Sequence, residues 1–154
     1  MARPKKNRMV QHPPVFTTFK PTGIPARHLK EIPLSLDQYE AIRLTDLLGY
    51  DHETAAKHMH ISRSTFTRLI EQARNVIAEF IVQGGNLVIG GGIVHFKTNR
   101  IYCKKCRKAF AVPIGKTVSV CPECGSENIE DLALLMGHGL CCLPDEEDRD
   151  PSSH

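Results

Sequence analysis

The arrangement of cysteines constrains this chain more than any other feature of its sequence. Four of them follow the pattern Cys103-x2-Cys106-x14-Cys121-x2-Cys124. Two Cys-x-x-Cys pairs at this separation fit a tetrahedral site in which four thiolates hold one zinc ion at Zn–S distances of about 2.3 Å. Because four protein thiolates leave no position for water, we expect one structural zinc ion, with iron as a substitute, rather than a catalytic centre.

The residues between the two pairs are strand-like at 110–113 and 117–120, which would bring the second pair back to the first. Residues 99–130 as a whole resemble a zinc ribbon, a β module too small to bury a sufficient core without its metal. The resemblance implies contacts with DNA, RNA or protein. Basic residues around the first pair would either contact phosphate or, as we favour, balance the charge of the thiolate-bound ion; they are Lys104, Lys105, Arg107 and Lys108.

Charge and cysteines divide the chain of 154 residues into two unlike parts, and its length suits one domain or two small ones. Residues 1–98 carry 13 Lys and Arg against 8 Asp and Glu, whereas residues 99–154 carry 7 against 9 together with all six cysteines. The sequence has no apolar run long enough for a membrane-spanning helix, and no apolar segment follows the basic N-terminus as in a secretory signal. We therefore expect a cytoplasmic protein whose cysteines serve metal or redox chemistry rather than disulfides.

Three helix starts follow the proline-rich N-terminal segment. Ser35 and Gln38 form the pattern of a capping box, Asp51 can cap a short second helix, and Ser62 can cap a third. The third helix has an apolar stripe that ends before Gly84; its members are Phe66, Leu69, Ile70, Ala73, Ile77 and Phe80. A short helix, a tight turn and a longer helix form the helix-turn-helix geometry that places the longer helix in a DNA major groove.

The polar side of the third helix carries the residue types that read base edges, and the first two turns of such a helix make most base contacts. We expect base contacts from Arg63, Ser64, Thr67 and Arg68. We expect phosphate contacts from Arg43, Lys57 and Arg74. A basic N-terminal arm would follow phosphates or enter a minor groove, or would only keep the N-terminus soluble; it contains Arg3, Lys5 and Lys6.

Residues 34–80 resemble the region-4 helix-turn-helix of bacterial sigma factors. The matching parts are L-x-L-D-x-x-E-A-I-R-L-x-D, E-x-A-A and I-S-R-S-T-F-x-R-x-x-x-x-A-R. Together with R-P-K-K-x-R at 3–8 and F-K-P-T-G-I-P at 19–25, they resemble an uncharacterised prokaryotic family of small predicted DNA-binding proteins over about residues 1–95. The resemblance implies base-facing positions for Arg63, Ser64, Thr65, Thr67 and Arg68. His60 stands where such turns usually have glycine.

Two further segments carry weaker signals. Residues 86–98 are expected to form a strand, a turn and a strand, and their apolar side chains are a candidate surface for a homodimer. Cys141 and Cys142 follow His138 closely, and they form part of a second metal site, a redox-sensing pair or an incidental exposed pair. A complete metal site would need a fourth ligand, for which the sequence offers His95 or His154.

The expected fold is a mainly α helix-turn-helix domain plus a small β zinc ribbon. Its parts are an extended basic arm at 1–33, the helical domain at 34–85, a strand-like connector at 86–98, the ribbon at 99–130 and an acidic, flexible tail with His and Cys at 131–154. The expected function is sequence-specific binding of double-stranded DNA in transcription regulation. No P-loop, dinucleotide, HExxH or nucleophile-elbow motif suggests an enzyme. The alternatives are an adaptor that binds RNA polymerase and a metal- or redox-sensing regulator that uses Cys141, Cys142 and His138.

Overall fold

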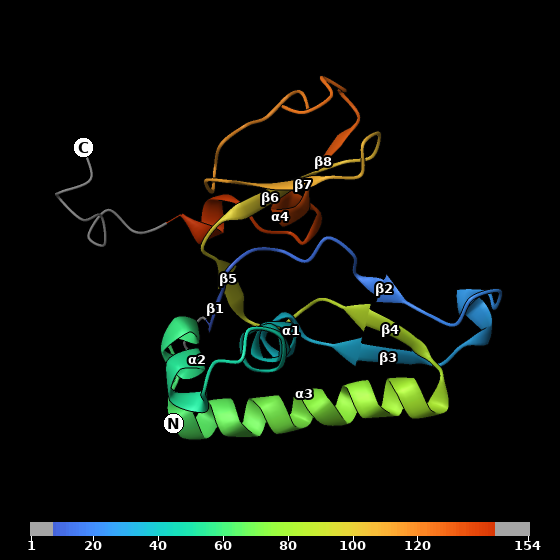
Figure 1. Ribbon diagram of the computed structural model, residues 1–154, viewed down its shortest axis with the longest axis vertical. Helices are drawn as coiled ribbons and strands as arrows, with labels where there is room; N and C mark the ends of the chain where they lie inside the picture. Colours follow the sequence, from blue (N-terminus) through green and yellow to red (C-terminus); the bar gives the residue numbers. More distant parts are fainter. Residues whose placement is uncertain (1–7, 144–154) are drawn as a thin grey trace, which may run out of the picture.

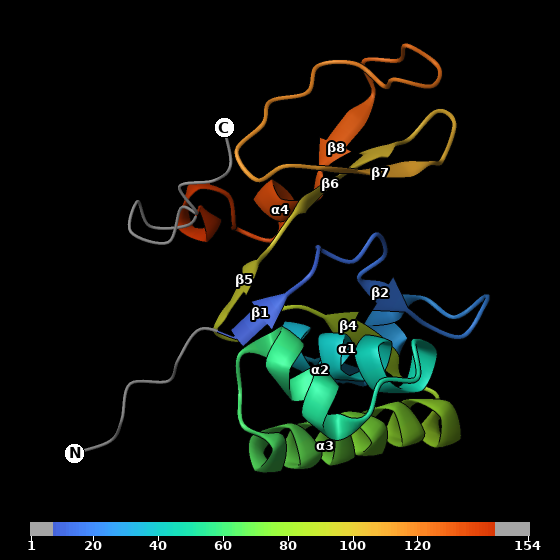
Figure 2. The same cartoon turned by 60° about the vertical axis from the view of Figure 1, so that its left-hand side comes forward.

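The computed structural model describes residues 8–143, which form a mixed α and β fold (Figures 1 and 2). Residues 8–96 form three helices and five short strands, and residues 99–143 add a three-stranded sheet and a short helix. The expected contacts of Arg3, Lys5 and Lys6 lie outside the described residues, as does the acidic end of the chain from Pro144. No helix within residues 8–143 has both the length and the apolar character that crossing a bilayer requires.

The helices of the first part begin at the predicted caps. They are α1 (Leu36–Ile42), which continues into a π-helical turn, η2 (Arg43–Leu47), then α2 (His52–Met59) and α3 (Arg63–Gln83). The side chains of Ser35, Asp51 and Ser62 each accept a hydrogen bond from the backbone N–H three residues further on, which confirms all three caps. The side chain of Gln38 accepts from the Ser35 N–H at 3.0 Å and completes the capping box.

The turn between α2 and α3 is fixed by its backbone. His60 adopts the left-handed conformation, with φ 56° and ψ 41°, in which glycine is the usual residue. The N–H of Ile61 donates to the carbonyl of Ala56 at 3.0 Å and closes the turn. α2 lies across the N-terminal part of α3 (Figures 1 and 2), and the two helices share one core. The buried side chains of this core include Ala55, Ala56, Met59, Phe66, Leu69 and Ile70.

Residues 8–33, expected as part of an extended arm, pair with later strands of the first part and contribute buried side chains such as Val10 and Ile32. They supply the strands β1 (Arg8–Val10), β2 (Thr18–Phe19) and β3 (Glu31–Leu34). β3 pairs in parallel with β4 (Asn86–Ile89), β4 pairs on its other edge with β2, and β1 pairs in parallel with β5 (Val94–Phe96). The many prolines obscured this pairing, although Val10, Ile32 and Leu34 are buried in the hydrophobic core.

The segment 86–98 forms the predicted strand, turn and strand, but it is not a free connector. Both strands pair with N-terminal segments, and their apolar side chains Leu87, Ile89, Val94 and Phe96 are buried. This burial removes four apolar side chains from the expected homodimer surface, while Ile93 stays exposed and the homodimer stays a prediction. Large apolar side chains are exposed elsewhere, on η2 and at the end of α3; they include Leu47, Ile81 and Val82.

The second part is built on an antiparallel sheet of order β7-β6-β8. Its strands are β6 (Asn99–Cys103), β7 (Ala109–Val112) and β8 (Ile129–Asp131). β7 confirms the strand expected at 110–113, whereas residues 117–120 form no strand and β8 takes the place beside β6.

Residues 131–143 pack onto this sheet and are not part of a flexible tail. They form the helix α4 (Leu132–Leu135) and a 3-10 turn, η3 (Leu140–Cys142). The side chain of Asn99 is buried, and it accepts a hydrogen bond from the Ala133 N–H at 3.0 Å while donating to Asp131 at 2.8 Å. These bonds satisfy the buried amide and fix α4 against β6.

Candidate nucleic-acid interface and metal centre

The start of α3 presents a polar surface because its apolar residues all face the core. Phe66, Leu69 and Ile70 are buried, so the polar residues among them lie toward the surface of the helix. The structure leaves Arg63, Ser64 and Arg68 exposed, and Thr65 and Thr67 partly exposed. All five predicted base-facing residues therefore lie at or near the surface of the first two turns.

The hydroxyl groups in this set already have partners, whereas the two arginines have none among the described residues. Thr67 Oγ1 lies 2.9 Å from Nδ1 of His52, and Ser62 Oγ donates to Thr65 Oγ1 at 2.8 Å. Within residues 8–143, neither Arg63 nor Arg68 forms an ion pair. The two threonines thus stabilise the turn between α2 and α3, and the guanidinium groups of Arg63 and Arg68 remain able to contact a ligand.

Strand β1 meets α3 at this surface. A hollow of about 190 Å³ is lined by Arg8, Thr65, Arg68, Leu69 and Gln72. Arg8 is also anchored by an ion pair with Asp37, whose Oδ2 lies 2.6 Å from its Nη1. The chain that precedes Arg8 therefore joins the described structure beside the predicted base-facing residues.

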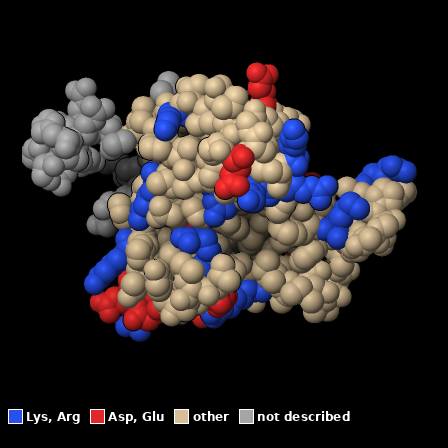
Figure 3. Space-filling view, turned by 45° about the horizontal axis from the view of Figure 1, so that its top comes forward, with Lys and Arg blue, Asp and Glu red and all other residues tan. Residues whose placement is uncertain are grey.

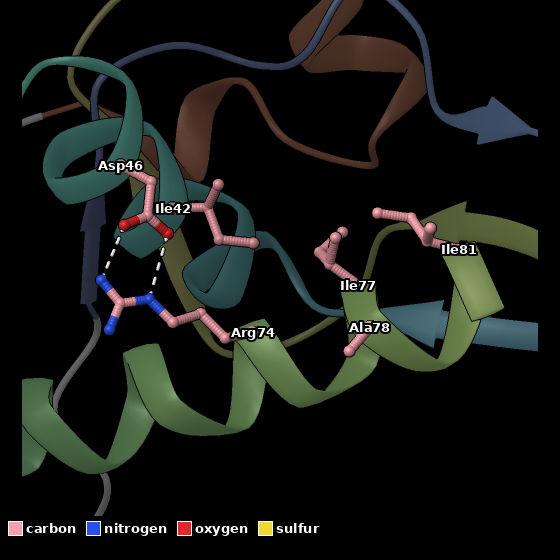
Figure 4. Close-up of a pocket in the computed structure, with 6 residues that line it drawn as sticks. All are labelled: Ile42, Asp46, Arg74, Ile77, Ala78 and Ile81. Carbon is pink, nitrogen blue, oxygen red and sulfur yellow. Dashed lines mark hydrogen bonds and ion pairs between the residues drawn. The ribbon is translucent and has the colours of Figure 1, made fainter.

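The three residues predicted to contact phosphate have different surroundings. Arg43 is half-buried in an ion pair with the buried carboxylate of Glu40, so the structure does not bring it to the surface of α3. Arg74 makes two hydrogen bonds to Asp46, of 2.7 and 3.2 Å, beside an apolar pocket that is lined by Ile42, Ile77, Ala78 and Ile81 (Figure 4). These bonds raise the pKa of the Arg74 guanidinium above its ordinary value.

The third of these residues, Lys57, is exposed and lies 3.9 Å from the carboxylate of Glu53. Acidic and basic side chains are mixed on the side of the molecule where α2 lies. Figure 3 shows them together at its lower left. The Thr54 N–H lowers the pKa of Asp51, and the charge of Arg63 adds to this effect. The negative charge of α2 is therefore offset locally by Arg63 and Lys57.

The four cysteines of the predicted metal site form one cluster. Their sulfur atoms all lie within 4.8 Å of one another, with Sγ–Sγ distances of 3.6 Å for Cys103–Cys124 and 3.7 Å for Cys106–Cys121. Two ligand sulfurs on a tetrahedral zinc ion with Zn–S bonds of about 2.3 Å are separated by about 3.8 Å. The cluster is therefore compatible with a bound metal ion such as zinc.

Both Cys-x-x-Cys loops have the same backbone hydrogen bonds. The N–H of Arg107 donates to the carbonyl of Cys103 at 2.8 Å, and the N–H of Gly125 donates to that of Cys121 at 2.9 Å. Arg107 and Gly125 both have positive φ, of 61° and 72°. In the first loop the Cys106 N–H lowers the pKa of the Cys103 thiol to about 7. The Lys108 N–H favours the thiolate of Cys106, but burial and hydrogen bonds to the other cysteine sulfurs raise the pKa of this thiol to about 11. The repeated turn therefore brings both pairs of sulfurs to one point and lowers the pKa of Cys103 but not that of Cys106.

The basic residues of the first loop are partly neutralised by carboxylates. Lys104 pairs with Glu130 and Lys108 pairs with Glu123, each at 2.7 Å. Lys105 and Arg107 are exposed and form no ion pair within the described residues. Two of the four expected positive charges are therefore free to balance the thiolates or to meet an anion.

A second cluster lies apart from the four cysteines. It brings His95 of β5 together with His138, Cys141 and Cys142, so the two vicinal cysteines are not an isolated pair. The sequence offered His95 and His154 equally as a fourth ligand, and His154 lies outside the described residues. The alternation of β5 was the available signal: Val94 and Phe96 are buried on one side, which leaves His95 on the other.

Comparison with known proteins gives the family of the chain. The profile of the family "Protein of unknown function DUF134" matches residues 1–97. A UPF0251 protein of Chloroherpeton thalassium is 45% identical over 135 residues, which cover 88% of this chain and 89% of the relative. A UPF0251 protein of Halothermothrix orenii is 41% identical over 135 residues, which cover 85% of this chain and all of the relative. No solved structure matches the chain. The chain therefore belongs to the DUF134/UPF0251 family of uncharacterised prokaryotic proteins.

Proposed function

We propose that this protein binds double-stranded DNA at specific sequences and regulates transcription, with α2, the His60 turn and α3 acting as a helix-turn-helix. The observation that carries the proposal is the pair of exposed arginines on the first turns of α3, Arg63 and Arg68, which have no ion-pair partner within residues 8–143. They lie opposite the buried side chains of Phe66, Leu69 and Ile70, so the start of α3 can enter a groove without disturbing the core.

In this proposal, Arg63 and Arg68 contact guanine edges in the major groove, since arginine can donate two hydrogen bonds to guanine O6 and N7. Gln72 lies on the same surface and would contact adenine. Arg8 lines a hollow together with Gln72, so it would contact a DNA phosphate beside the bases that α3 reads. Exposed Lys57 contacts a DNA phosphate. It gives up its 3.9 Å contact with the carboxylate of Glu53 when DNA binds.

The four-cysteine module acts in this proposal as a zinc ribbon with a structural ion. Its four thiolates complete a tetrahedral shell, so the ion would stabilise residues 99–130 and would not activate water. We therefore propose a binding protein and not an enzyme. An adaptor that binds RNA polymerase is the competing function, and the experiment below separates the two.

Selection of bound duplexes from a random pool, with the zinc-loaded full chain, tests the proposal. We expect one enriched motif, and each of the variants R63A and R68A should weaken binding to it by about 5- to 150-fold, or about 1–3 kcal/mol, with relaxed preference at one base position. The matched control is R27A, which removes another exposed arginine, in the 3-10 turn Ala26–His28. Circular dichroism checks that each variant keeps its helices.

Two results would overturn the proposal. Equal losses for R63A and R68A on every duplex would show that the arginines contact only phosphate. Enrichment of no motif, together with co-purification of RNA polymerase, would favour the adaptor.

A further inference from the structure

We propose that His95, His138, Cys141 and Cys142 form a second metal site, separate from the four-cysteine centre, that takes a tetrahedral divalent cation of the zinc type. One donor atom from each residue lies within 4.8 Å of the other three. Two imidazoles and two thiolates are a ligand set typical of structural zinc. The inference does not depend on DNA binding.

The distances within the cluster are those of ligands around one ion. Cys141 Sγ lies 3.7 Å from Cys142 Sγ, and Nδ1 of His138 lies 3.5 Å and 3.4 Å from these two sulfurs. With Zn–S of about 2.3 Å and Zn–N of about 2.0–2.1 Å, tetrahedral geometry requires an S···S distance of about 3.8 Å and an N···S distance of about 3.6 Å. A disulfide would need about 2.05 Å between the sulfurs.

His95 reaches the cluster from a different part of the chain. β5 places its ring beside that of His138, with ring centroids 6.3 Å apart and the planes nearly perpendicular at 88°. Nδ1 of His95 is buried and has no hydrogen-bond partner among the described residues. Buried polar atoms normally have a partner, and a cation bound by the ring would provide one.

The surroundings of the cluster hold its ligands in place. The backbone N–H of Phe96 donates to Cys142 Sγ at 3.3 Å and fixes the position of this buried sulfur. The ring of Phe96 packs edge-on against His138 at a centroid distance of 5.0 Å. The His138 N–H donates to the carbonyl of Ala133 at 2.8 Å, so α4 fixes the position of this histidine. Such supporting contacts are a regular feature of metal sites in proteins.

A cation at this site would join two parts of the fold. His95 lies on β5, which pairs with β1 in the first part, whereas the other three ligands follow α4 in the second part. A cation bound here would therefore link the end of the described chain to the first part of the fold.

Metal analysis of the full chain tests the site. After reduction, saturation with zinc and removal of unbound metal, we expect two zinc ions per chain. The double variant C141S/C142S and the single variant H95N should each retain one ion. H28Q, which replaces an exposed histidine outside both clusters, should keep two and serves as the matched control.

Cobalt(II) substitution shows which site has lost its ion and whether each variant is folded. Wild-type protein should show d–d absorption from two tetrahedral environments, S4 and S2N2. In C141S/C142S the S2N2 component should disappear while the S4 component remains, which also shows that the second part of the fold is intact. A wild-type protein that saturates at one ion with only the S4 spectrum would overturn the inference, as would retention of two ions in both H95N and C141S/C142S.

Discussion

Replacement of His60 by glycine tests how the turn between α2 and α3 is held. A side chain at φ 56° places its Cβ against the backbone, which costs about 1–2 kcal/mol. Glycine avoids this cost but gives the unfolded chain more freedom, which offsets about 0.5–1 kcal/mol of the gain. His60 is exposed, and its side chain forms no hydrogen bond within residues 8–143. We therefore expect H60G to raise the free energy of unfolding by about 0.5–1 kcal/mol.

The matched control is the same substitution two residues earlier. His58 is also exposed, but it lies inside α2 and stacks on Tyr50 with ring centroids 5.2 Å apart. Glycine within a helix is about 1 kcal/mol less favourable than alanine and histidine lies between them, so H58G should lower the free energy of unfolding by about 0.5 kcal/mol, in addition to the lost stacking on Tyr50. The two variants remove the same side chain and should change stability in opposite directions.

Urea denaturation of the zinc-loaded protein, followed by the helical circular dichroism signal, measures both changes. Thermal unfolding should show shifts of about 2–4 °C for each kcal/mol in a chain of this size. A lower unfolding midpoint for H60G, or shifts of the same sign for both variants, would refute the view that the left-handed turn carries a local cost.

Three further predictions concern packing, charge and metal. A Cβ added at Gly85 would lie 2.6 Å from the Lys30 carbonyl oxygen, so G85A should lower the free energy of unfolding by about 1–3 kcal/mol, as measured by urea denaturation. K57A should weaken binding to every duplex alike and reduce the slope of log affinity against log salt by about 1; an unchanged slope would exclude a phosphate contact. The Cys106 N–H lowers the pKa of the Cys103 thiol to about 7, whereas the pKa of the Cys106 thiol is raised to about 11, so below pH 7 zinc must displace protons from both thiols. Competition with a chelator should therefore remove zinc from the four-cysteine centre more readily as the pH falls through 7, and a pH-independent affinity would contradict this reasoning.

The features that could be predicted from the sequence are those set by neighbours in the chain. Ser35, Asp51 and Ser62 each satisfy an N–H group three residues away, so a short pattern is sufficient to place the helix starts. The spacing within each Cys-x-x-Cys pair likewise describes a local turn, and the structure brings the two turns together as expected.

The missed features depend on contacts between distant segments. The prolines of residues 1–33, Pro33 among them, predicted an extended arm without strand pairing to later segments, but β3 is an edge strand of the sheet β2-β4-β3, where proline is tolerated. His95 and His138 are far apart in the sequence, and only the placement of β5 beside the end of the chain brings them together. Periodicity and spacing contain no information on which strands pair, so neither result could be derived from local patterns.

The parallel pairing of β3 with β4 and of β1 with β5 has a consequence for how the protein folds during synthesis. The partner strands flank the whole helical region, so α1, α2 and α3 emerge from the ribosome before the segment that completes their core. The core shared by α2 and α3 contains only residues that precede β4 and β5, whereas the core beneath β3 also needs residues 86–96 and closes a long loop, which is slow. A truncated chain that ends at Gly85 would lack both strands and leave Ile32 and Leu34 without their neighbours in the core, so a fragment that keeps these contacts must extend at least to Phe96.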